Sequence, residues 1–164
     1  MIFFNKKHKS QIYINLLNLS RNIFFYKKTS LQDNFETRIY LMFIHFSIIL
    51  IIFKKVKIRF PQDKYDDLFY CIENNLRELG FGDVAVNKKM KIFNKILYDI
   101  LLKINKSEEQ IKINKSLIYK YCPEFGKLSN KEFTLFDQYF LNFYHFCFEL
   151  PTETMIKESL NFRG

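Results

Sequence analysis

Tryptophan is absent from this sequence, alanine occurs once, and the chain holds only three prolines and four glycines. Isoleucine and phenylalanine each occur twenty times, and lysine outnumbers arginine twenty-one to five. The abundant residues have AT-rich codons and the scarce ones GC-rich codons, so base composition offers one explanation for the lysine excess. The net charge of +9 therefore indicates an anionic partner only if the basic residues gather on one surface.

Motifs that would carry catalysis or bind metal are also missing. The chain has no GxSxG, no phosphate-binding P-loop, no Rossmann fingerprint and no HExxH. The cysteines Cys71, Cys122 and Cys147 form no CxxC and cannot all pair, which fits buried thiols in a reducing compartment. The three histidines have no metal-ligand spacing. We predict no catalytic site, no cofactor and no metal site, which makes a small all-α enzyme the weakest of the alternatives.

The length and composition predict one folded domain. The chain has 164 residues, of which 48% are hydrophobic and 18% aromatic, enough for a real core. Residues 1–9 are basic, and we expect them to be flexible, with one all-helical domain over 10–164. No acidic residue precedes Asp33, which raises a transit peptide as an alternative. However, apolar residues at 3–4 spacing from Ile12 to Ile23 favour a domain helix.

Apolar periodicity predicts an all-α, single-domain bundle of about seven helices. The expected helices cover residues 10–22, a start at Ser30 or Asp33 to 53, 62–79, a start between 83 and 88 to 104, 107–121, 129–149 and 152–162. Asp33 with Glu36, and Ser107 with Gln110, have capping-box spacing. Sustained alternation with a period of two, which would indicate strands, is not found.

The long apolar segment Ile39–Phe53 contains no charged residue. It is shorter than the about 20 residues that a spanning helix needs, and His45 and Ser47 lie in its middle. We interpret it as a core helix with His45 as a hydrogen-bonded core histidine, and membrane insertion is the alternative.

The segment Asn75–Lys91 predicts a tight junction between two helices. Gly80 follows the expected helix end at Leu79, where a left-handed residue costs most side chains about 1–2 kcal/mol and glycine almost nothing. Phe81 is expected to fold back on the last turn, and Gly82 is a second permissive position. Asp83 and Asn87 are candidate caps for the next helix. That helix would carry Lys88, Lys91 and Lys95 on one face.

The same junction resembles a known family. The segment NLRELGFGD with the following basic VNKKMK is similar to the signature of the ubiquinol–cytochrome c chaperone family, as are SRNIFFY from Ser20 and DNFETRIYLMFIHFSI from Asp33. The resemblance covers about residues 12 to 105. The family often has proline where Asn87 stands, and asparagine also suits the start of a helix.

The resemblance implies an all-α, non-enzymatic assembly chaperone that binds newly made cytochrome b and promotes its entry into ubiquinol–cytochrome c reductase, respiratory complex III. Mitochondrial members act near the ribosome with a small partner protein. Carried onto this chain, the resemblance implies a client- or partner-binding surface made of Arg77, Glu78, Phe81, Asp83, Lys88, Lys89, Lys91 and Lys95. The residues with an architectural role would be Gly80, Gly82, Asp33, Arg38 and His45.

Structural explanations stand beside these roles. Arg77 and Glu78 at a helix end, and the lysines, also fit a solvated face. A ribosome- or RNA-binding accessory protein that uses its basic face is the alternative function. Because the matching part lies close to the first residue, we expect a bacterial cytoplasmic form, peripheral to the inner membrane. The expected compartment of a eukaryotic form is the mitochondrial matrix.

Overall fold

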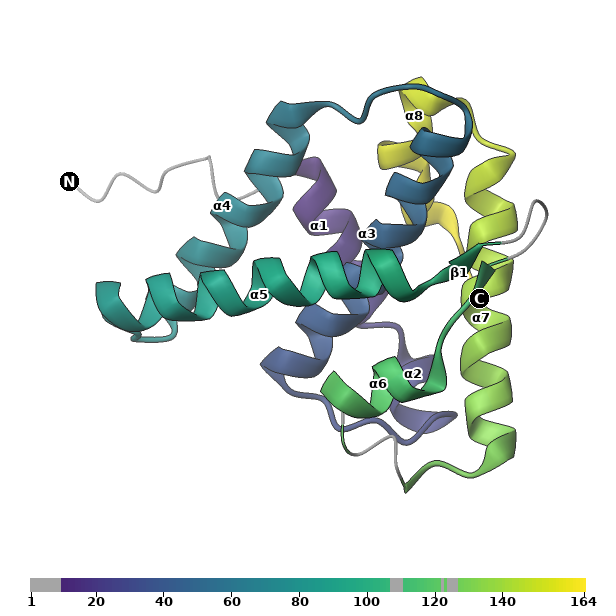
Figure 1. Ribbon diagram of the computed structural model, residues 1–164, viewed down its shortest axis with the longest axis horizontal. Helices are drawn as coiled ribbons and strands as arrows, with labels where there is room; N and C mark the ends of the chain where they lie inside the picture. The colour runs from purple at the N-terminus through teal and green to yellow at the C-terminus, as the bar shows by residue number, and fades with distance from the viewer. Residues whose placement is uncertain (1–9, 107–110, 122, 124–126) are drawn as a thin grey trace.

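The computed structural model describes residues 10–106, 111–121, 123 and 127–164, and helices account for most of them (Figure 1). The helices are α1 (Gln11–Ser20), α2 (Ile23–Lys27), α3 (Phe35–Lys55), α4 (Gln62–Glu78), α5 (Asp83–Lys103), α6 (Lys115–Tyr121), α7 (Asn130–Phe148) and α8 (Thr152–Glu158), followed by a 3₁₀ turn, Ser159–Asn161. A small antiparallel ladder joins β1 (Asn105–Lys106) to β2 (Ile111–Lys112). The predicted all-α bundle is confirmed.

Helix α3 is the centre of the molecule. From Ile39 to Phe53 all residues except Tyr40 and Leu50 are buried. Helices α1, α5 and α7 pack against α3 on different sides, and α8 and the 3₁₀ turn pack on α1. A helix enclosed in this way buries apolar residues around its whole circumference, which explains why its sequence shows no polar stripe. The prediction of a core helix agrees with this burial.

The predicted first residues of two helices, 10 and 129, are their N-cap residues in the structure, whereas the predicted cap of a third helix is not its cap. The Ser10 and Ser129 hydroxyls accept from the amides of Tyr13 and Glu132. Helix α3, however, is capped by Asn34, whose side chain accepts from the Thr37 amide at 2.8 Å. The prediction that Ser30 or Asp33 caps this helix is therefore wrong, because the Asp33 carboxylate is engaged by Arg38 instead.

The expected helix over residues 107–121 is the second correction. Its predicted capping box, Ser107 with Gln110, lies outside the described residues. Residues Ile111–Lys112 form a strand, and α6 begins only at Lys115. Ile111 and Ile113 are buried while Lys112 is exposed, an alternation with a period of two. This alternation is too short to stand out in the sequence.

Helix α2 is a short helix that was not predicted from the sequence. Asn22 caps it, and Phe25 is fully buried against α7, with its ring centroid 4.6 Å from that of Tyr139 and 5.7 Å from that of Phe140. The short helix therefore holds the chain before α3 against the C-terminal part of the bundle.

Candidate functional site

The junction between α4 and α5 has the geometry predicted around Gly80. Leu79 ends α4, and Gly80 has a φ of +95°, in the left-handed region. The Gly80 amide donates to the Arg77 carbonyl at 3.0 Å, and the Phe81 amide donates to the Leu76 carbonyl at 3.3 Å. This pair of hydrogen bonds is the Schellman motif. The conformation of Gly80 is therefore what directs the chain out of α4.

The start of α5 differs from the prediction. Gly82 is the N-cap residue with a φ of −74°, which any residue adopts, so its freedom as a glycine is not used. Asp83 is the first residue of α5, and Asn87 lies inside the helix rather than at its start. The predictions of Gly82 as a permissive position and of Asp83 or Asn87 as caps are wrong. The helix begins at Asp83, one residue earlier than a cap at Asp83 allows and five residues earlier than a cap at Asn87 allows.

Four of the predicted binding residues are engaged within the chain. Arg77 pairs with Glu73 at 2.8 Å, one turn earlier in α4, and with Asp83 across the junction. The Lys89 ammonium lies 4.8 Å from the centroid of the Phe81 ring, a cation–π contact. These contacts tie the end of α4 to the first turns of α5. Glu78 is exposed beside them.

The remaining predicted binding residues face solvent. Lys88, Lys91 and Lys95 are exposed on α5, opposite the buried face that contains Phe93 and Leu97. Within the described ranges, none of the three lysines forms an ion pair. They are available to a partner.

Asp33 and Arg38 form an ion pair at the start of α3. Arg38 Nε donates to Asp33 Oδ1 at 2.7 Å, and this hydrogen bond lowers the pKa of the Asp33 carboxyl. Burial, followed by the charge of Asp33, raises the pKa of Tyr26 to about 12. The pair joins the loop before α3 to its first turn.

A pocket of about 500 Å³ opens next to this pair and next to the junction. It lies between α1, the start of α3 and the end of α4. Its lining contains Tyr13, Leu17, Arg21, Asp33, Asn34, Phe35, Arg38, Ile39, Met42, Asn75 and Leu79. The three segments that carry the family resemblance therefore meet here, because Arg21, Asp33 with Arg38, and Leu79 come from one segment each. We call this the junction pocket.

The junction pocket combines an apolar interior with a charged mouth. Its buried aliphatic side chains are Ile39 and Met42, whereas Arg21, Asp33 and Leu79 are exposed. Asn75 donates to the Tyr13 hydroxyl at 2.8 Å, which links α4 to α1 along its wall. Such a lining suits an apolar group that carries a polar or charged neighbour.

Sequence reasoning missed most of the pocket. Leu79 was predicted as the end of a helix, yet its side chain is 56% exposed at the mouth of the pocket. Arg21 lay within the SRNIFFY segment of the resemblance and was not singled out. Tyr13 and Asn75 gave no individual signal, because only the packing of α1 on α4 brings them together.

His45 lies in the core and not at the pocket. Its Nδ1 is 2.7 Å from the Leu41 carbonyl, so Nδ1 carries the hydrogen, and its Nε2 accepts from the Tyr139 hydroxyl at 3.0 Å. Burial lowers the pKa of His45 to about 3. It is a neutral, hydrogen-bonded core residue, as predicted from the sequence.

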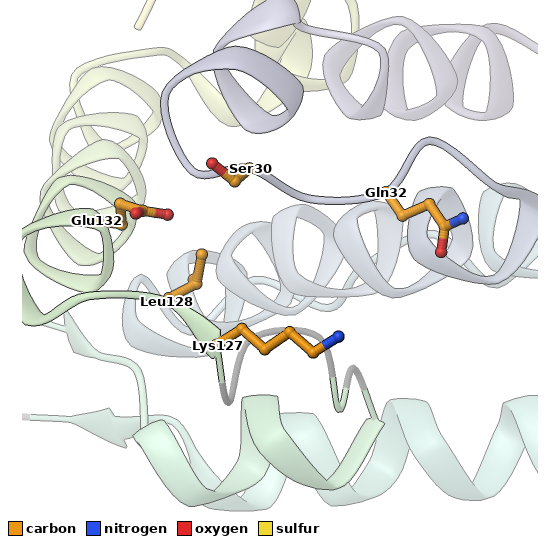
Figure 2. A pocket seen from close by; sticks show the side chains of 5 residues that line it. All are labelled: Ser30, Gln32, Lys127, Leu128 and Glu132. Carbon is orange, nitrogen blue, oxygen red and sulfur yellow. The ribbon is translucent and has the colours of Figure 1, made fainter.

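A second pocket, of about 390 Å³, lies between the chain that leads into α3 and the start of α7 (Figure 2). Ser30, Gln32, Lys127, Leu128 and Glu132 line it, and none of these is a predicted site residue. No cluster of His, Cys, Asp and Glu side chains within the described residues could hold a metal ion. Cys71 and Cys147 are buried thiols, and Cys122 lies outside the described residues.

The described helices form an all-α bundle with a partly apolar pocket beside the helix junction, a concave site of the kind that ligands and peptide segments occupy. The chain belongs to the ubiquinol–cytochrome c chaperone family, whose family model matches residues 27–115, more than half of the sequence. No curated protein and no solved structure gives a significant match. Family membership supports a chaperone role in the assembly of respiratory complex III and associates the protein with the respiratory membrane or the mitochondrion. It also suggests a non-enzymatic role.

Proposed function

We propose that this protein binds newly made cytochrome b and promotes its assembly into ubiquinol–cytochrome c reductase. The observation that carries the proposal is the meeting of the three family-like segments at the junction pocket, within a chain that belongs to the chaperone family. Residues that are far apart in sequence form one binding surface there. A role in recognition explains why these segments occur together.

The junction pocket matches the chemistry of a membrane-protein client. Transmembrane helices present apolar side chains that need cover before insertion, and charged or aromatic residues often flank them. The apolar interior around Met42 and Ile39 takes the apolar side chains, and Arg21 and Asp33 meet the polar flank. A volume of about 500 Å³ holds a few side chains rather than a whole helix. The client segment is therefore the end of an apolar helix.

The same proposal includes partners and a location. In a bacterial cell the protein would act in the cytoplasm, peripheral to the inner membrane, and in a eukaryote in the mitochondrial matrix. A position near the ribosomal exit tunnel and a small partner protein would let it meet cytochrome b during synthesis. Exposed Glu78, Lys88, Lys91 and Lys95 are the predicted partner contacts left unpaired within the described part of the chain.

Deletion of the gene, followed by heme spectra of isolated membranes, tests the proposal. We expect cytochrome b and assembled reductase to fall while unrelated respiratory enzymes stay at normal levels. The wild-type gene should restore cytochrome b, and Leu79→Glu should not, because it puts a charge at the pocket mouth. Ile23→Glu is the matched control, since Ile23 is 60% exposed and lies away from the pocket lining. Normal cytochrome b in the deletion strain would refute the proposal.

A ribosome- or RNA-binding accessory protein is the second candidate, and the exposed lysines of α5 favour it. If phosphate contacts supply the affinity, loss of each lysine lowers the slope of log K against log salt by about one unit. If client capture is apolar, replacing Lys88, Lys91 and Lys95 by Gln leaves cytochrome b crosslinking largely intact. Loss of both ribosome binding and crosslinking in that variant would favour the second candidate.

A further inference from the structure

The outward face of α5 carries an unbroken line of exposed residues. Val84, Lys88, Lys91, Lys95, Tyr98 and Leu102 follow one another at alternating steps of four and three residues, so they lie along one side of the helix. We call this line the α5 outer stripe. Helix α5 runs across α3 along one side of the molecule (Figure 1), and its buried face contacts the core. The stripe therefore faces away from α3.

The charge of this stripe is positive and is not compensated by α5 itself. The helix has two acidic residues, and both are paired: Asp83 with Arg77, and Asp99 with Lys103 at 3.0 Å and Lys120 at 2.9 Å. Hydrogen bonds from Tyr121, Lys120 and Lys103 lower the pKa of Asp99, which holds it in the charged, paired form. The three stripe lysines thus present their charge to solvent. An anionic partner complements them.

The two ends of the stripe are apolar. Val84 is 84% exposed and Leu102 is 81% exposed, which makes them the most exposed large hydrophobic residues among those described. Tyr98 is 57% exposed beside Leu102. At 1.5 Å per residue the two ends are about 27 Å apart. Water-exposed apolar side chains at both ends of a basic line suit a partner that offers both negative charge and an apolar interior.

We infer that the α5 outer stripe docks on the surface of a bilayer with anionic lipid headgroups. Lys88, Lys91 and Lys95 contact the headgroups, while Val84, Tyr98 and Leu102 enter the boundary between headgroups and acyl chains. RNA explains the stripe less well, because arginine is absent from it and phosphate contacts would leave Val84 and Leu102 in water.

This docking deepens the proposed function, on which its biological meaning rests. Leu79 at the mouth of the junction pocket and Val84 at the start of the stripe flank the same tight junction. A protein lying on α5 therefore holds the pocket mouth close to the lipid surface. An apolar helix end would pass from the pocket to the bilayer over a short distance.

Sedimentation of the purified full-length protein with lipid vesicles tests the inference without any client. We expect binding to vesicles of phosphatidylcholine with phosphatidylglycerol at physiological salt, and much weaker binding to phosphatidylcholine alone. Replacing the three stripe lysines by Gln should weaken binding about 100-fold, since each lysine near an anionic surface contributes roughly a factor of five. The control Lys27→Gln, Lys28→Gln, Lys54→Gln removes the same charge from exposed positions elsewhere and should have a much smaller effect.

A second pair of variants separates lipid from RNA. Val84→Ser with Leu102→Ser keeps every charge and should weaken vesicle binding at least about tenfold, because burial of the two side chains is lost. Ile23→Ser with Ile58→Ser, at positions 60% and 45% exposed, is the control. Equal vesicle binding by the Val84–Leu102 variant and the wild type, or RNA binding with no vesicle binding, would overturn the inference. Cytochrome b levels in the deletion strain test the proposed function separately.

Discussion

His45 shows how one buried residue sets a pH dependence. In the folded protein its ring forms hydrogen bonds with the Leu41 carbonyl and the Tyr139 hydroxyl instead of with water. The ring centroids of Phe140 and Phe143 each lie 4.8 Å from the centroid of the His45 ring. This surrounding accepts the neutral ring and disfavours the charged one. The unfolded chain, whose histidine has its ordinary pKa of 6.5, takes up a proton at a much higher pH than the folded chain does.

We therefore predict that His45 destabilises the protein in acid. The folded pKa is depressed to about 3, so this contribution is absent above pH 6.5 and grows as the pH falls through the window between 6.5 and 3. Between pH 7.5 and pH 5 it amounts to about 2 kcal/mol. Denaturant unfolding of the wild type and of His45→Gln measures it. The variant should be less stable at pH 7.5 but should lose less stability on acidification, and parallel curves would contradict this account.

Gly80 provides the second prediction for a single residue. A Cβ at Gly80 meets no atom within 4 Å, so substitution is opposed by the φ of +95° alone and not by a clash. Gly80→Val should cost about 1–2 kcal/mol and should relax by tilting α4 relative to α5, which moves Leu79 at the pocket. We expect client crosslinking to be lost at temperatures where the helical circular dichroism signal persists.

Gly82→Thr is the matched control for Gly80→Val. It places a β-branched side chain of similar size two residues later, at an N-cap with ordinary φ and open space. Threonine is also a good N-cap residue. Crosslinking should survive in this variant, and its loss in both variants alike would show that bulk, rather than the backbone conformation of Gly80, disturbs the junction.

At the scale of a single element, α3 meets the length and composition criteria of a membrane-spanning helix. An 18-residue window of α3 has a mean hydropathy of 1.7, but 72% of that window is buried inside the protein. No other helix in the described residues meets those criteria. Helices α1, α5 and α7 pack against α3 and already occupy the place that lipid would take around a spanning helix.

We predict that the protein leaves the membrane in alkaline carbonate. Inserting α3 into a bilayer would require it to separate from α1, α5 and α7, and would expose their apolar faces to water. Carbonate extraction of membranes, followed by detection of the protein in supernatant and pellet, measures this. A genuine spanning protein from the same membrane is the control and should stay in the pellet. Retention of this protein there would mean that α3 spans.

For the whole molecule, the segment matched by the family is not the whole of the core. Residues 27–115 contain α3, α4 and α5. Outside this segment, α1 and α7 pack on α3, and α8 packs on α1. Phe25 and Phe140, which lie outside the matched segment, stack against each other, and both make edge-to-face contacts with His45. The matched segment therefore relies on chain from both sides of it.

We predict that a fragment of residues 27–115 does not unfold cooperatively, because one side of α3 would be exposed. Residues 10–164 should melt at the same temperature as the full chain, since our expectation is one domain over 10–164. Thermal unfolding followed by circular dichroism compares the three proteins. A sharp transition in the short fragment, or a large shift on removal of residues 1–9, would contradict the proposed domain boundaries.

Local sequence determined most of the long helices and the turn at Gly80, because apolar spacing, caps and the left-handed preference of glycine act over a few residues. The apolar segment of α3 likewise determined a core helix. Only the tertiary structure decided that Asn34 rather than Asp33 caps α3, since Arg38 holds the Asp33 carboxylate. It also decided that residues 111–112 pair as a strand. The junction pocket depends on how α1, α3 and α4 pack, and contacts between distant residues leave no periodic signal in a single sequence.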